Sequence, residues 1–264
     1  MAVFQTTFAC DSLWRSIDLN VIIPFESPGR PDLAPLKPAR FKTLYLLHGF
    51  GGNRNDWMNY TPLRDIAERN NIAIVLPEAE NSFYVDSVSL PFQYGKLIRE
   101  IVDFTRRAFP LSDKREDTFI GGLSMGGFGA LRLGSLYHDV FSKVFSFSGA
   151  FIIDDIADQQ PGYQDLIANY DYYVRTFGDL SKVKGSEKDP LWCLDQAIAA
   201  GEAPAVYQAC GTEDFLYQEN LGMKAELESR PVSYEYHEMP GIHDWIFWNK
   251  NLEPAILWLL KENR

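Results

Sequence analysis

The sequence predicts an α/β fold: a mostly parallel central sheet with antiparallel strands at its N-terminal start and helices on both faces. Short, continuous apolar runs such as 43–47 (TLYLL) and 72–76 (IAIVL) recur along the chain, and such runs are typical of strands that are buried on both faces of a parallel sheet. Helical stretches separate these runs. Strands that alternate with helices imply right-handed crossovers in one doubly wound sheet.

The antiparallel start is predicted by an alternating pattern. Leu13, Ile17, Leu19 and Val21 are separated by mostly polar residues, which is the period of a strand with one buried face. Residues 3–9 are its predicted hairpin partner. Residues 26–40 hold four prolines and are predicted to form a loop.

The later elements follow in alternation. Further strands are expected at 118–120, 144–147, 205–207 and 234–238, and helices at about 56–69, 92–109, 126–137 and 215–229 and at the C-terminus. No composition break divides the chain, so we expect one domain over residues 1–264. Residues 154–200 interrupt the alternation with polar and aromatic side chains. They predict a cap-like excursion above the carboxyl ends of the strands, where open α/β sheets bind ligands.

Composition and charge narrow the classes of function. The chain holds 25 Lys and Arg against 36 Asp and Glu, a formal net charge of −11, which disfavours a nucleic-acid partner because nucleic acid attracts a basic face. No apolar run reaches the length of a membrane span. The start of the chain lacks the regions of a secretory signal, so we expect a cytoplasmic protein. The three cysteines are far apart and form neither a disulfide framework nor a metal-ligand spacing, so we expect no metal and no cofactor.

A nucleophile is predicted at Ser124. Gly122, Ser124 and Gly126 match the pattern G-x-S-x-G, in which the serine sits on a strained turn and larger side chains two residues away would collide. The predicted strand 118–120 precedes the pattern and the predicted helix 126–137 follows it, as the pattern requires. The first turn of that helix directs N–H groups and a positive dipole end at the serine. A glycine-rich turn with an incidental serine is the disfavoured alternative.

Acyl transfer through a serine also needs two N–H donors aimed at the developing oxyanion. One is expected from the backbone of Met125, directly after the nucleophile. The other is expected from Phe50 in the loop 46–52 (LLHGFGG), whose glycines let the backbone approach a substrate closely. We interpret His48 in this loop as a residue that pins the turn through hydrogen bonds rather than one that titrates in the mechanism.

His243 is the predicted general base among four histidines. It lies in a loop between the strand 234–238 and the C-terminal helix, and from such a loop an imidazole can reach the serine. His237 lies within that strand and His138 at the end of a predicted helix. Both positions favour structural roles.

The acid that orients the base is predicted at Asp214. In serine enzymes built on an α/β sheet, the acid lies between the nucleophile and the base along the chain. Asp214 follows a predicted strand and the turn at Gly211, from which a loop can direct its carboxylate toward His243. Glu213 and Asp244 compete with it for this role.

Together these residues resemble the tributyrin esterase/esterase D family of α/β-hydrolases. The resemblance covers nearly the whole chain and is carried by LLHGFGG, NDW, GLSMGGFGA, SFSGAF, CGTEDFL and PGIHDWIFW. It implies the α/β-hydrolase fold, with Ser124, Asp214 and His243 as the catalytic triad and Phe50 and Met125 as oxyanion donors. Wider relatives of this family include S-formylglutathione hydrolases, feruloyl and acetylxylan esterases, and antigen 85 mycolyltransferases.

The resemblance is strongest to the bacterial tributyrin-esterase branch, which favours short acyl chains. S-formylglutathione hydrolases usually carry Ser-Gly in place of His48-Gly49, which disfavours their activity here. The expected function is a serine carboxylesterase that hydrolyses short-chain acyl esters through an acyl-serine intermediate. Acyl transfer and the deacylation of carbohydrate or feruloyl esters by the same triad are the alternatives. The intact triad disfavours a non-catalytic binding protein.

Substrate contacts are predicted at Trp245 and Trp248, which with Phe247 form an aromatic cluster next to the predicted base. With the aromatic residues of 154–200, they predict a short, walled acyl pocket. The expected partner is a small-molecule ester, with neither nucleic acid nor membrane. The sequence leaves open whether the chain forms a homo-oligomer.

Overall fold

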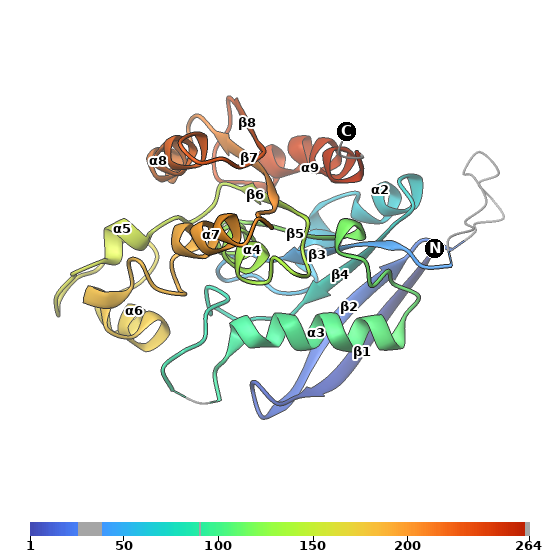
Figure 1. The fold of residues 1–264 in the computed structure, drawn as a ribbon, viewed down its shortest axis with the longest axis horizontal. Coiled ribbons are helices and arrows are strands. Elements are labelled where there is room, and N and C mark those ends of the chain that lie inside the picture. The colour runs from blue at the N-terminus through green and yellow to red at the C-terminus, as the bar shows by residue number, and fades with distance from the viewer. Residues whose placement is uncertain (26–38, 90, 262–264) are drawn as a thin grey trace.

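The apolar runs of the sequence form one central sheet in the computed structural model, which describes residues 1–25, 39–89 and 91–261 (Figure 1). Its strands are β1 (Ala2–Cys10), β2 (Arg15–Ile23), β3 (Lys42–Leu47), β4 (Ile72–Pro77), β5 (Thr118–Leu123), β6 (Lys143–Phe147), β7 (Ala205–Gly211) and β8 (Tyr234–Met239). Across the sheet they follow the order β1-β2-β4-β3-β5-β6-β7-β8. Apart from its last two residues, the loop predicted over 26–40 lies outside the described residues.

The sheet begins antiparallel and continues parallel. β1 and β2 form a hairpin that runs from Ala2 opposite Ile23 to Cys10 opposite Arg15, and β2 is antiparallel to β4. From β4 across to β8, neighbouring strands are parallel. The predicted hairpin and mixed sheet are therefore confirmed. The carboxyl ends of β3 to β8 consequently meet at one edge of the sheet.

Helices fill the connections between the strands. They are α1 (Asp56–Tyr60), α2 (Leu63–Arg69), α3 (Tyr94–Ala108), α4 (Met125–Leu136), α5 (Ile153–Ile156), α6 (Tyr170–Phe177), α7 (Pro190–Ala199), α8 (Tyr217–Glu228) and α9 (Trp245–Leu260). The single helix predicted over 56–69 is wrong. The backbone is extended at Thr61, and the following Pro62, which has no N–H to donate, precedes α2. Among the described helices, none is long and apolar enough to cross a membrane.

The helices cover both faces of the sheet (Figure 1). Leu131 of α4 belongs to the core on one face, together with apolar side chains of α3, α7 and α8. Ile256 of α9 belongs to the core on the other face, together with side chains of α1 and α2. Successive strand residues point to opposite faces: Tyr45 of β3 enters the first core, whereas Leu44 enters the second.

The segment 154–200 is helical in pieces, as predicted, and includes α6 and α7. Asn169 caps α6 by accepting the Tyr172 N–H, and Asp189 caps α7, which are favoured N-cap residues. Tyr173 and Phe177 are buried in the core. Part of the aromatic content of this segment therefore serves packing rather than a surface site.

Candidate active site

Ser124 lies on the sharp turn between β5 and α4, in a backbone conformation that L-residues rarely adopt (φ 54°, ψ −120°). Strained backbone of this kind persists only where the surrounding structure fixes it. The Ser124 N–H donates to the Phe147 carbonyl at 2.8 Å, and the Ser124 carbonyl accepts the Ala150 N–H at 3.0 Å. The Ser124 side chain makes no capping hydrogen bond to α4. Its hydroxyl is therefore available for chemistry.

The glycines on either side of the serine are required by close backbone contacts. A Cβ atom on Gly122 would lie 2.5 Å from the carbonyl oxygen of Gly126. A Cβ atom on Gly126 would lie 2.5 Å from the carbonyl oxygen of Leu47 at the end of β3. Both distances are shorter than real Cβ contacts allow. The steric reason predicted for the pattern G-x-S-x-G therefore applies in this chain.

The loop after β3 packs against the nucleophile. A Cβ atom on Gly49 would lie 3.5 Å from the Cβ of Ser124, so the backbone passes directly beside the serine. In the part of the chain that the structure describes, the backbone N–H groups of Phe50 and Met125 donate to no protein acceptor. The two predicted oxyanion donors are thus unpaired N–H groups on the two segments that meet at Ser124.

His48 pins this loop. Its Nε2 accepts the Ala79 N–H at 3.1 Å, so the ring proton sits on Nδ1, which donates to the Gly49 carbonyl at 2.8 Å. Burial lowers the pKa of His48 below its ordinary value, which favours the neutral ring. Gly51 of the same loop donates its N–H to Asn81 Oδ1 at 2.7 Å. These contacts fit the predicted structural role of His48.

His243 and Asp214 are in direct contact. Nδ1 of His243 lies 3.0 Å from each carboxylate oxygen of Asp214. Because a carboxylate only accepts, Nδ1 carries the proton and Nε2 is left as the basic nitrogen. Burial raises the pKa of Asp214, but hydrogen bonding and charge interaction with His243, together with the Leu216 N–H, outweigh burial and hold that pKa below its ordinary value. The carboxylate is therefore ionised at neutral pH.

The competing carboxylates lie elsewhere. Asp244 caps α9 by accepting the Phe247 N–H at 2.9 Å, and Glu213 is exposed. Of the three acidic candidates, Asp214 is the one whose carboxylate contacts His243.

One edge of the sheet gathers the three predicted catalytic residues. Ser124 follows β5, Asp214 follows β7 and His243 follows β8, and these strands are parallel. Among the hydrogen bonds of the described residues, none joins the Ser124 hydroxyl to His243. Contacts of this kind are often long without substrate and tighten when it binds. The site therefore places a serine hydroxyl that does not cap its helix at the same sheet edge as an imidazole hydrogen-bonded to a carboxylate.

Ser148, which sequence reasoning missed, lies between Trp248 and the acid. The indole Nε1 of Trp248 donates to Ser148 Oγ at 3.1 Å, and Ser148 is among the groups that lower the pKa of Asp214. Trp248 is 5% exposed, and its ring centre lies 5.0 Å from that of His243. Trp245 is less buried. A substrate-binding role for the two tryptophans stays a prediction. In the sequence, Ser148 is recognisable as a candidate site residue only because it directly follows the buried strand β6.

Two further aromatic side chains border the site. Tyr172 of α6 lies with its ring 5.6 Å from that of Phe50, and its hydroxyl donates to the Asn81 carbonyl at 2.7 Å. Phe215 is 50% exposed, and its ring lies 4.6 Å from the imidazole of His243. The excursion thus contacts the predicted oxyanion loop. Sequence reasoning named neither Tyr172 nor Phe215 as a site residue, because their contacts depend on tertiary packing.

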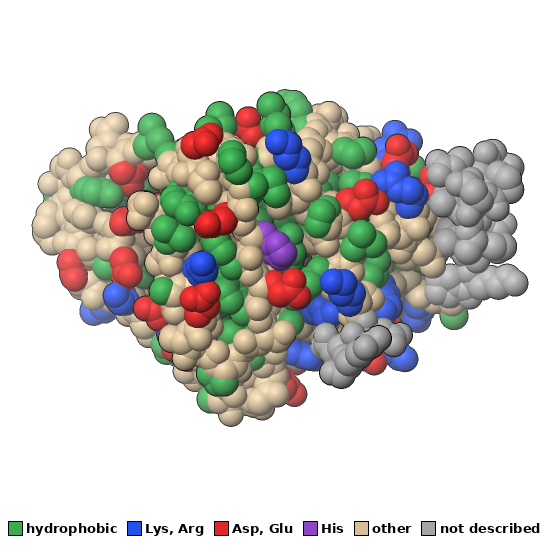
Figure 2. Space-filling view, turned by 90° about the horizontal axis from the view of Figure 1, so that it is seen from above, with side chains coloured by type: hydrophobic (Ala, Val, Ile, Leu, Met, Phe, Trp, Pro, Cys, Tyr) green, Lys and Arg blue, Asp and Glu red, His purple; other side chains and the backbone are tan. Residues whose placement is uncertain are grey.

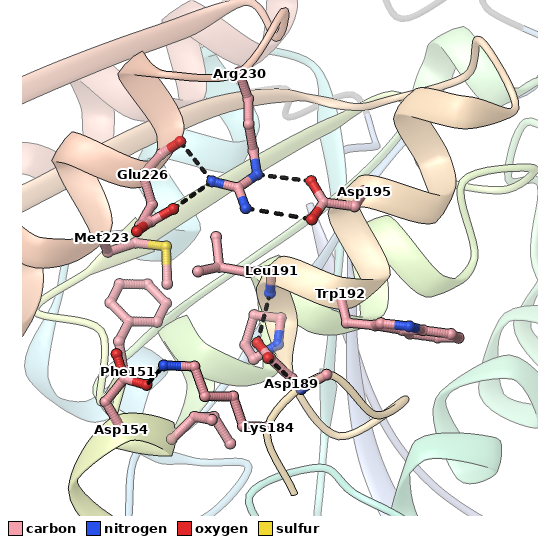
Figure 3. A pocket seen from close by; sticks show the side chains of 13 residues that line it. Phe151, Asp154, Lys184, Asp189, Leu191, Trp192, Asp195, Met223, Glu226 and Arg230 are labelled. Atoms are coloured by element: carbon pink, nitrogen blue, oxygen red, sulfur yellow. Dashed lines mark hydrogen bonds and ion pairs between the residues drawn. The ribbon is translucent and has the colours of Figure 1, made fainter.

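A separate hollow opens between α5, α7 and α8 (Figure 3). None of the three predicted catalytic residues lines it. Arg230 is held there between Asp195 and Glu226, and Lys184 pairs with Asp154. Because both of its cations already have acidic partners, this hollow does not have the features of an anion site.

Comparisons with known proteins identify the family of this chain. Residues 31–259 match the family model Esterase, which is described as "Putative esterase". The chain is 40% identical over 263 residues to an acetyl esterase of Caldicellulosiruptor saccharolyticus, and the match covers 99% of both chains.

Solved structures show the same fold. Fluorophosphonate-binding serine hydrolase F of Staphylococcus aureus superposes with a TM-score of 0.85 at 30% identity, over 99% of both chains. An S-formylglutathione hydrolase of Staphylococcus aureus superposes with a TM-score of 0.82 at 31% identity, over 98% of this chain and 99% of the other. The predicted α/β-hydrolase fold is thereby confirmed. The chain belongs to the Esterase family of α/β-hydrolases and is a serine carboxylesterase.

Proposed function

We propose that this protein hydrolyses short-chain acyl esters through an acyl intermediate on Ser124, with His243 as general base and Asp214 as the acid that orients it. One observation carries the proposal. The His243–Asp214 pair, joined at 3.0 Å, lies at the sheet edge where the strained Ser124 offers an uncapped hydroxyl.

The roles of the residues follow from the donors and acceptors. Nε2 of His243 takes the hydroxyl proton as Ser124 Oγ attacks the ester carbonyl, and the N–H groups of Phe50 and Met125 receive the oxyanion. The imidazolium then gives that proton to the leaving alcohol. In the second half, His243 takes a proton from water, which attacks the acyl carbon, and returns that proton to Ser124 Oγ as the bond between Oγ and the acyl carbon breaks and the acid is released. Asp214 fixes the imidazole tautomer and stabilises the imidazolium throughout.

Acetyl to butyryl esters should be the better substrates. We expect kcat/KM for p-nitrophenyl acetate or butyrate to exceed that for the octanoate by at least ~10-fold, because a walled pocket cannot bury the additional methylenes. The 40% identical relative is named an acetyl esterase, and the contact between Tyr172 and Phe50 forms part of the proposed wall. A monotonic rise in kcat/KM toward long chains contradicts the proposal.

A pair of variants locates the wall. Tyr172→Ala should raise kcat/KM for the octanoate relative to the acetate. Tyr170→Ala, on the same helix, serves as the matched control and should leave that ratio unchanged. An equal change in both variants would show that loss of helix α6, rather than loss of the wall, is responsible.

A thioester substrate is the second candidate. The observation in its favour is the 31% identical S-formylglutathione hydrolase, although His48-Gly49 replaces the usual Ser-Gly of those enzymes. S-formylglutathione and p-nitrophenyl acetate both carry very small acyl groups, so their kcat/KM values should be compared directly on purified enzyme. Transfer to an added alcohol is tested in the same assays by measuring how the acyl group partitions between ester and acid.

We further propose that residues 1–264 form one domain in which the segment 154–200 caps the site. The contact of Tyr172 with the oxyanion loop supports this role. The formal charge of −11 and the interspersed acidic and basic side chains on the face drawn in Figure 2 favour a small-molecule partner over nucleic acid. Three buried free cysteines fit a reducing cytoplasm.

Catalysis should not depend on thiols or metals. Burial raises the pKa of Cys193 and Cys210 to about 12, and the thiolate is the reactive form. The described residues include no cluster of three or more His, Cys, Asp or Glu side chains placed to hold a metal. We expect iodoacetamide and EDTA to leave initial rates on p-nitrophenyl acetate within ~2-fold. Chelator inhibition that one particular metal reverses would reveal a missed site.

A further inference from the structure

The amide of Asn220 on α8 is fully buried and has a partner for each of its donors and acceptors. Its Nδ2 donates to the Gly149 carbonyl at 2.9 Å and to the Leu216 carbonyl at 2.8 Å. Its Oδ1 accepts the Gly149 N–H at 3.2 Å and Nε2 of Gln208 at 3.0 Å. Buried networks in which every member is satisfied hold one arrangement of the chain.

On one side, Asn220 holds the loop that fixes the nucleophile. Gly149 lies between Phe147, whose carbonyl accepts the Ser124 N–H, and Ala150, whose N–H donates to the Ser124 carbonyl. Asn220 binds both the N–H and the carbonyl of Gly149. A shift of this loop would therefore move the strained backbone of the nucleophile.

On the other side, Asn220 holds the loop that carries the acid. Its Nδ2 binds the carbonyl of Leu216, and the N–H of the same Leu216 donates to Asp214 Oδ1 at 2.9 Å. That carboxylate contacts His243. One side-chain amide thus joins the backbone around the nucleophile to the backbone around the acid.

Two residues behind Asn220 set the direction of its amide. The Tyr234 hydroxyl on β8 donates to Gln208 Oε1 at 2.6 Å, and burial raises the pKa of Tyr234, so this hydroxyl keeps its proton. With its oxygen turned to Tyr234, Gln208 presents Nε2 to Asn220. Asn220 must then present its oxygen to Gln208 and to the Gly149 N–H, and its nitrogen to the two carbonyls.

We propose that the hydrogen-bonded chain Tyr234–Gln208–Asn220 is a positioning device that sets the acid–base pair at its working distance from the nucleophile. The inference rests on the roles proposed above for Ser124 and Asp214. Asn220 and Gln208 are fully buried, and the Tyr234 hydroxyl is bound to Gln208. The three residues act through Gly149 and Leu216.

Asn220→Asp and Asn220→Ala test the proposal. Asp keeps the shape but puts an oxygen against the two carbonyls, and Ala removes the four hydrogen bonds of the side-chain amide. We expect kcat for p-nitrophenyl acetate to fall by ~10- to 100-fold, because misplacements near 1 Å have effects of this size, while KM changes little.

Asn251 on α9 provides the matched control. It is 2% exposed, and its Nδ2 donates to the Phe247 carbonyl four residues earlier at 2.9 Å, as Asn220 does to Leu216. Asn251→Ala should lower Tm and leave kcat unchanged. Equal loss of kcat in the Asn220 and Asn251 variants would overturn the proposal.

Active-site titration separates positioning from folding. A fluorophosphonate probe counts the serines that can react, and kcat is then expressed per titrated site. The proposal expects a nearly full titre in the Asn220 variants with a reduced kcat per site. A wild-type kcat per site in these variants overturns it. Failure of the probe to label Ser124 in the wild type would instead refute the proposed function.

Tyr234→Phe extends the test along the chain. It removes the hydroxyl and keeps the ring, so we expect a smaller loss of kcat than in Asn220→Ala. In the Asn220→Ala background, Tyr234→Phe should cost nothing further, because residues that act through one another are not additive. Additive losses of kcat would show that Tyr234 and Asn220 do not act through one hydrogen-bonded chain.

Discussion

Ser124→Ala is expected to lower kcat for ester hydrolysis by at least ~10⁴-fold, because the covalent route disappears and the remaining groups give only residual catalysis. The change removes the hydroxyl without disturbing a cap, since the Ser124 side chain does not cap α4. Initial rates on p-nitrophenyl acetate, with enzyme prepared in a host that lacks background esterase, measure the effect. Turnover within ~10-fold of wild type would refute Ser124 as the nucleophile.

Ser124→Gly is the companion variant. It lacks the hydroxyl in the same way but relieves the backbone strain at φ 54°, because glycine adopts positive φ without steric cost. We expect both variants to be inactive and the glycine variant to have the higher Tm of the two. This difference would show that the strain at the nucleophile is real and is held by the fold.

Asp214→Asn has the second largest expected effect, a loss of at least ~10²-fold in kcat. Asparagine keeps the shape, but its amide can place a donor against His243 Nδ1 and so favour the wrong tautomer of the imidazole. The corresponding change in serine proteases costs about 10⁴-fold. Steady-state kinetics and circular dichroism on the purified variant measure the loss and confirm folding.

The competing carboxylates serve as matched controls for Asp214. Asp244→Asn keeps a favoured N-cap residue on α9, where Asp244 accepts the Phe247 N–H, so activity should change little. Glu213→Gln alters an exposed side chain and should also be close to neutral. If Asp244→Asn lowered kcat strongly while Asp214→Asn left it near the wild-type value, the acid would be misassigned.

The lowered pKa of Asp214 also makes the stability of the fold depend on pH. A carboxylate whose pKa is lower in the folded than in the unfolded state stabilises the fold above its unfolded pKa. Hydrogen bonds and charge interaction with His243 outweigh the effect of burial and lower this pKa, so the stabilisation is lost as the pH falls through the folded pKa.

The parts of the site that sequence predicted are those encoded locally. The glycines around Ser124, and the loops at Phe50 and His243, are recognisable because a few adjacent residues determine each turn. The choice of Asp214 over Glu213 also depended on the local order of strand, turn and carboxylate. The structure adds the contact with His243 that a local pattern cannot show.

The parts that sequence missed depend on contacts between distant segments. Ser148 meets Trp248 across 100 residues, and Asn220 meets Gly149 across 71. Nothing near Asn220 distinguishes it from a solvent-exposed helical amide until the strands are assembled. The split of the predicted helix 56–69 was different in kind, because Pro62 was visible in the sequence as a reason for a break.

The candidate catalytic residues lie at the carboxyl ends of the strands, so the opposite edge of the sheet, at the amino ends of the parallel strands, can be modified without touching them. The turns that lead into β4, β5, β6, β7 and β8 emerge at that second edge. Ser229, in the turn before β8, is exposed, whereas the native cysteines are buried. A thiol introduced there by Ser229→Cys would accept a maleimide linker selectively. Immobilised through it, the enzyme would present its catalytic edge to the flowing substrate rather than to the support.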